Sequence, residues 1–96
     1  MSRIQINPIS EEKKKALKIP VKCENTSDWS VWECKPSKFD WHYDSKEVAY
    51  VYEGKVKVKT SVEEVEISSG DLVTFPSGLS CSWEVIEKIR KVYKFE

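Results

Sequence analysis

The side chains of this chain that could take part in chemistry gather in two short stretches. The first, "DWHYDSKE", begins at Asp40, ends at Glu47 and holds His42, which is the one histidine of the chain. The second, "GLSCSW", holds Cys81. Carboxylate, imidazole and thiolate groups together form a plausible ligand set for zinc, iron, nickel or manganese. We therefore treat Asp40, His42, Glu47 and Cys81 as candidate ligands of one divalent metal.

The alternation of side chains along a strand determines which of these groups can meet. Asp40 and His42 would share one face of a strand, while Trp41 and Tyr43 would share the other. We expect the polar pair to face inward, together with Glu47. Buried polar groups without partners are costly, so a metal or a hydrogen-bond network would have to compensate.

Each candidate ligand also has a purely structural reading. His42 could be a half-buried ring held by Asp40 or Glu47, because buried polar groups usually find partners. Asp40 could instead lie in water at the mouth of the fold, and Cys81 could pack as a small core residue. Glu47 is harder to explain as core, since an inward carboxylate needs a cation, His42 or a ligand beside it.

Two of these residues could act in catalysis, and two aromatic residues could shape a pocket. Glu47 could serve as a general base if an apolar interior raised its pKa. Cys81 could be a nucleophile only if a neighbour lowered the pKa of its thiol, and His42 is the one candidate. Trp83 and Phe75 either fill the interior or form the wall of a pocket for a small polar metabolite.

A non-catalytic role competes with these readings. By the same alternation the outer face would carry Trp41, Tyr43, Tyr50 and Tyr52. Exposed aromatic side chains of this kind are enriched at protein interfaces. The alternative function is therefore a homodimeric binding module without a bound metal.

The elements that would position these groups are short β-strands, from Trp29 onward. Apolar and polar residues alternate in "WSVWEC", "KFDWHY" and "KVKVKT", and Val56 and Val58 are expected to face inward. The stretch "EVAYVYEG" is expected to end at Gly54, and further strands are predicted in "VEEVEI", "LVTF", "LSCSWEV" and "IRKVYKFE". Many short strands separated by turn signals indicate a sandwich or barrel.

The first part of the chain differs from the rest. "SEEKKKAL" opens with Ser10, a good helix cap, and the helix it predicts must stop before Pro20. We therefore divide the chain into an N-terminal arm, residues 1–28, with a strand or short helix, and a barrel, residues 29–96.

Composition excludes several classes of partner. Sixteen basic and sixteen acidic residues give a net charge of zero, without the basic surplus that a nucleic-acid binder needs. No apolar run approaches the roughly 18 residues of a membrane span. Three cysteines without a CxxC pair favour reduced thiols inside a cell. The N-terminus lacks the apolar region of a secretory signal, so we expect a cytoplasmic protein, or a plastid protein whose transit peptide has been removed.

The spacing of the turn and ligand positions resembles that of the cupins, small β-barrels of the jelly-roll type. Their first motif contains HxH, then three or four residues, Glu, six residues and Gly. Glu47, followed by "VAYVYE" and Gly54, fits this pattern, and His42 falls on the second histidine. Asp40 stands where the first histidine would be.

The second cupin motif is Gly, five residues, Pro, any residue, Gly, two residues and His. Gly70, Pro76 and Gly78 fit it, and Cys81 stands at the histidine position. "YVYEGKVKV" and "FPSGLSCSW" are similar to the short single-domain cupins grouped with the ureidoglycine aminohydrolase and ethanolamine-utilisation cupins. The resemblance implies a small all-β cupin barrel with a short N-terminal helix, and a pocket that binds or transforms a small polar metabolite, with a metal as a possible aid.

Overall fold

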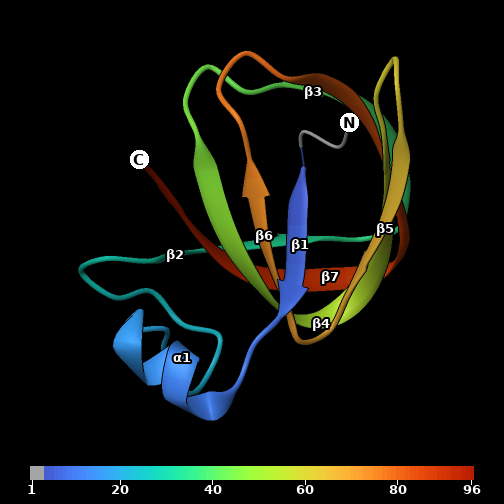
Figure 1. The fold of residues 1–96 in the computed structure, drawn as a ribbon. Coiled ribbons are helices and arrows are strands. Elements are labelled where there is room, and N and C mark those ends of the chain that lie inside the picture. The colour runs from blue at the N-terminus through green and yellow to red at the C-terminus, as the bar shows by residue number, and fades with distance from the viewer. Residues whose placement is uncertain (1–3) are drawn as a thin grey trace.

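The computed structural model describes residues 4–96, so residues 1–3 of the predicted N-terminal arm lie outside the described part of the chain. The described residues are mostly β-structure, with one short helix (Figure 1). The elements, in chain order, are β1 (Gln5–Pro8), α1 (Glu11–Ala16), β2 (Ser30–Cys34), β3 (Ser37–His42), β4 (Glu47–Lys59), β5 (Glu64–Ser68), β6 (Asp71–Phe75) and β7 (Ser80–Phe95).

The strands form one antiparallel sheet that curls around an interior (Figure 1). The path of neighbouring strands is β1-β6-β4-β7-β2, and β5 and β3 pair with β4 and β7 respectively. The prediction of a closed barrel is wrong, because β1 and β2 end this path without pairing with each other. No helix in residues 4–96 is long and apolar enough to cross a membrane.

Two long strands, β4 and β7, organise the sheet, and neither was predicted as a single strand. We expected a strand end at Gly54, but β4 continues through it to Lys59. The pairing of β4 with β7 shifts register between Val51 and Val56, as it does at a β-bulge. The shift changes which positions face inward: Glu47 and Val51 are buried before it, and Val56 and Val58 after it. The inward orientation predicted for these two valines is confirmed.

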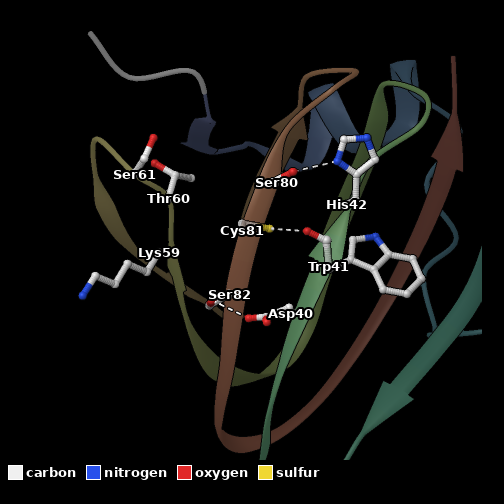
Figure 2. A pocket seen from close by; sticks show the side chains of 9 residues that line it. All are labelled: Asp40, Trp41, His42, Lys59, Thr60, Ser61, Ser80, Cys81 and Ser82. Atoms are coloured by element: carbon white, nitrogen blue, oxygen red, sulfur yellow. Dashed lines mark hydrogen bonds between the residues drawn. The ribbon is translucent and has the colours of Figure 1, made fainter.

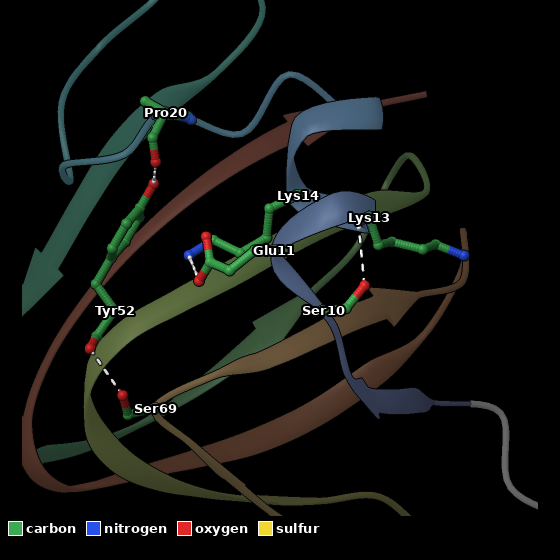
Figure 3. A network of polar contacts seen from close by, with 7 residues as sticks. All are labelled: Ser10, Glu11, Lys13, Lys14, Pro20, Tyr52 and Ser69. Carbon is green, nitrogen blue, oxygen red and sulfur yellow. Dashed lines mark hydrogen bonds and ion pairs between the residues drawn. The ribbon is translucent and has the colours of Figure 1, made fainter.

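The segment that links β1 to β2, residues 9–29, is called the N-terminal segment here and packs on the outside of the sheet (Figure 1). Ser10 caps α1 by accepting a hydrogen bond from the backbone N–H of Lys13 at 3.2 Å. Lys14 Nζ lies 4.9 Å from the centroid of the Tyr50 ring. The hydroxyl of Tyr52 donates to the carbonyl of Pro20 (Figure 3). Burial and neighbouring charges raise the pKa of Tyr52 to about 12.

The outer cluster corrects part of the interface prediction. It contains Trp29, Tyr50 and Val92 among its buried residues, with Tyr52 packed against them. We expected Tyr50 and Tyr52 to be exposed for a partner, but the chain covers them with its own N-terminal segment.

Candidate functional site

The inward face of β3 is the opposite of the predicted one. Phe39, Trp41 and Tyr43 turn toward the interior, and Tyr43 is buried there. Asp40 and His42 are exposed on the other side of the strand. The reason is the apolar area of Phe39 and Tyr43, whose burial is favourable, whereas burial of a carboxylate and an imidazole is costly. Trp41 shares their side of the strand but remains 52% exposed at the edge of the interior.

Asp40 and His42 instead hydrogen-bond to neighbouring serines of β7 (Figure 2). His42 Nδ1 lies 2.7 Å from the hydroxyl of Ser80, and its side chain is 53% exposed. The Ser82 hydroxyl donates to Asp40 Oδ1 at 2.7 Å. Both side chains border an open surface depression beside residues 59–61. His42 is therefore not the half-buried ring we considered.

Cys81 is buried in the interior cluster and also borders the depression that Asp40 and His42 line. Its thiol donates to the carbonyl of Trp41 at a distance of 3.7 Å. Burial is the main influence on this thiol and raises its pKa. The condition for a nucleophilic Cys81, a lowered thiol pKa caused by His42, is therefore not met.

Glu47 is buried, as predicted, and its partner is a lysine that the sequence analysis missed. Lys91 Nζ donates to Glu47 Oε2 at 2.9 Å, and each side chain is only 6% exposed. The two residues start from different strands, β4 and β7, and meet in the interior. A signal for Lys91 exists in "IRKVYKFE": Ile89, Lys91 and Tyr93 alternate with outward residues, so the lysine shares their inward face.

Aromatic rings surround the ammonium group of Lys91. Its Nζ lies 4.9 Å from the ring centroid of Trp83 and 5.0 Å from that of Trp32. The rings of Tyr93 and Phe75 follow at 5.7 and 5.8 Å. Burial lowers the pKa of Lys91, and the carboxylate of Glu47 opposes that effect in part.

The four predicted metal ligands do not meet. Asp40 and His42 point outward, whereas Glu47 and Cys81 belong to the interior. Within residues 4–96 no three His, Cys, Asp or Glu side chains form a group that could hold a metal ion. The ammonium of Lys91 already neutralises Glu47, where a cation would have to bind. This arrangement of donors does not fit a divalent metal.

A cavity of about 290 Å³ lies beside the Glu47–Lys91 pair. Trp83 lines it, as predicted, whereas Phe75 lies behind the wall and stacks on Tyr43 with ring centroids 4.6 Å apart. The indole Nε1 of Trp83 is buried and makes no hydrogen bond of standard geometry within residues 4–96, although the Tyr43 hydroxyl and the Cys81 thiol lie close enough to interact with it. The residues lining the cavity are Trp32, Phe39, Trp41, Tyr43, Glu47, Trp83, Lys91, Tyr93 and Phe95.

The cavity therefore combines three chemical features. Its walls are aromatic, its acid–base pair is buried, and the Trp83 Nε1–H makes no hydrogen bond of standard geometry within residues 4–96. Sites for small molecules have this composition: apolar walls with a few polar groups that fix the orientation of the ligand.

Comparison with known proteins places this geometry in a family context. The model of the EutQ-like cupin domain matches residues 21–93. Among curated proteins, the chain is 31% identical over 63 residues to a protein named acetate kinase EutQ from Clostridioides difficile (strain 630). The match covers 66% of this chain and 40% of that protein, so the chain spans about two fifths of its length.

Solved structures show the same fold. A DUF861 family protein from Thermotoga maritima is 41% identical, with a TM-score of 0.86 over 97% of this chain and 99% of that chain. The structure of the Clostridium difficile EutQ protein is 29% identical, with a TM-score of 0.63 over 68% of this chain and 52% of that chain.

Proposed function

This chain belongs to the family of EutQ-like cupin domains, and on that premise we propose that it binds a small polar metabolite in the aromatic cavity. The observation that carries the proposal is the Glu47–Lys91 pair on the cavity wall. Burying two charges costs several kcal/mol per ion, and apolar residues of similar size would often make a core at least as stable. Charged groups retained beside a cavity are candidates for function.

The cavity restricts the size and the polarity of the ligand. At about 290 Å³ it lies near the lower limit for small-molecule sites, which favours a small metabolite. The rings would contact apolar parts of the ligand. A carbonyl or hydroxyl oxygen of the ligand would accept a hydrogen bond from the Lys91 ammonium, which lines the cavity. We assign Glu47 the role of proton acceptor in the site, with Lys91 beside it.

Nuclear magnetic resonance of the tryptophan indole groups tests this proposal. The panel consists of small amides, ureas, aldehydes and hydroxy acids. We expect at least one of these compounds to shift the Trp83 Nε1–H signal. Trp83→Phe should keep the fold and weaken binding of such a compound about five-fold, because it removes part of the aromatic surface that lines the cavity.

Trp29 supplies an internal control in the same spectrum. Its Nε1 donates to the carbonyl of Leu17 at 3.2 Å, in the cluster outside the sheet. Its signal should stay fixed when the Trp83 signal moves. A panel in which no compound moves the Trp83 signal selectively would contradict binding in the cavity.

Homodimerisation is the second candidate, and the observation that favours it is exposed aromatic surface at the cavity. Trp41 is 52% and Phe95 is 56% exposed, and both line the cavity. We expect light scattering after size exclusion to show a dimer that Trp41→Ser dissociates. Val62→Ser, which alters an exposed apolar residue absent from the cavity wall, should leave the dimer intact. A monomeric wild type would refute this candidate.

A further inference from the structure

We propose that Lys91 forms an imine with a small aldehyde or ketone bound in the cavity, with Glu47 carrying the proton between nitrogen and oxygen. This inference rests on the proposed function, because it names the class of compound that the cavity would take. It differs from metal chemistry, since the reacting group belongs to the chain itself.

The position of the amine supports this assignment. Among the described residues that line the cavity, Lys91 carries the one amine. In the described part of the chain its Nζ has one hydrogen-bond partner, Glu47 Oε2, and its other neighbours are ring faces. Ring faces bind a cation but accept its protons poorly, so any proton that leaves the nitrogen has Glu47 as its acceptor. Lysines that are desolvated among apolar side chains are the kind that react with carbonyl compounds.

The surroundings also suit the product. An iminium ion keeps the positive charge at the same nitrogen, so the pairing with Glu47 and the contacts with the Trp32 and Trp83 rings persist. The aromatic wall limits access of water, which would otherwise hydrolyse the imine.

The atoms and charges balance through Glu47. The Lys91 ammonium gives a proton to the Glu47 carboxylate, and the free amine attacks the carbonyl carbon as the π electrons move to oxygen. Glu47 returns its proton to that oxygen, giving a hydroxyl, and removes one from the nitrogen. Glu47 then protonates the hydroxyl, water leaves, and the nitrogen lone pair forms the C=N bond. The products are an iminium ion, one water molecule and the Glu47 carboxylate.

Reductive trapping tests the inference. The full chain is treated at neutral pH with propanal and sodium cyanoborohydride, which delivers hydride to an iminium carbon and leaves a stable propyl group. Peptide mapping by mass spectrometry then gives the labelling rate of each lysine. Lys55 is the matched control, since its Nζ pairs with Glu66 at 3.6 Å on the surface of the sheet.

We expect Lys91 to be labelled at least about ten-fold faster than Lys55, because its amine is desolvated among aromatic rings, whereas Lys55 is partly exposed to water. The measurement is made on the wild-type chain, so it needs no variant that could fail to fold. In parallel, the Trp83 Nε1–H signal is followed during titration with propanal and with 1-propanol, which has no carbonyl group.

The two readouts separate the two proposals. If both compounds shift the Trp83 signal and Lys91 is labelled no faster than Lys55, the imine is overturned while binding in the cavity stands. If neither compound shifts the signal and Lys91 is not labelled preferentially, the imine is overturned as well, and the wider metabolite panel alone decides the proposed function.

Discussion

Replacing Glu47 with leucine is expected to lower the free energy of unfolding by about 3–5 kcal/mol, because it leaves the Lys91 amine buried without a partner. That loss is a large part of the stability of an ordinary domain, which is roughly 5–15 kcal/mol. Lys91→Met should have a similar effect, because it leaves a buried carboxylate instead. The double variant Glu47→Leu/Lys91→Met should recover most of the loss, because neither charge remains.

Urea denaturation of the four proteins gives the coupling energy of the pair directly. The control is the surface pair of Lys55 and Glu66, in which both side chains are partly exposed. Glu66→Leu should change stability by no more than about 1 kcal/mol, as is usual for exposed ion pairs. Losses below about 1 kcal/mol in both single variants at the buried pair would contradict the burial we describe.

Replacing Gly54 with alanine is expected to cost about 3 kcal/mol or to prevent folding. Gly54 has φ +105°, a conformation that residues with a side chain rarely adopt. A Cβ atom there would lie 2.3 Å from the backbone carbonyl oxygen of Lys88 and 2.6 Å from the Cα of Ile89. Both contacts are with backbone of the neighbouring strand β7, so relief would require the two longest strands to separate.

Gly70 separates the two causes. It has a similar φ of +93°, but a Cβ there would meet no atom within 4 Å. Gly70→Ala therefore measures the backbone strain alone, which we expect to be about 1 kcal/mol. Thermal unfolding of both variants checks the difference, since 1 kcal/mol corresponds to roughly 4–8 °C in a domain of this size. Equal effects of the two substitutions would contradict the close approach at Gly54.

The alternation of residues predicted which side chains share a face, but not which face is buried. Asp40 and His42 do lie on one side of β3, and Trp41 and Tyr43 on the other. Assigning the polar pair to the interior rested on treating Asp40 and His42 as ligands of one metal together with Glu47. The apolar area of Phe39, Trp41 and Tyr43 would have indicated the opposite assignment, because the larger apolar face gains more from burial.

Other features depend on contacts between distant segments. Lys91 is one lysine among many in a chain of mixed charge, and its pairing with Glu47 arises only when β4 and β7 lie side by side. The bulge at Gly54 shifts the alternation of inward and outward residues within β4. The alternation is regular before the bulge and regular after it, but it does not continue across the bulge. The covering of Tyr50 by the N-terminal segment likewise depends on how that segment folds back.

The central claim is that ligands bind in the cavity at Glu47 and Lys91, and not at the outer face that carries His42. The most direct test uses the panel compound that shifts the Trp83 signal most, titrated into wild type, His42→Ala and the double variant Glu47→Leu/Lys91→Met. We predict an unchanged Kd in His42→Ala and a Kd at least about ten-fold higher in the double variant, a loss of roughly 1.4 kcal/mol. Weaker binding in His42→Ala with unchanged binding in the double variant would contradict the claim and place the site on the outer face.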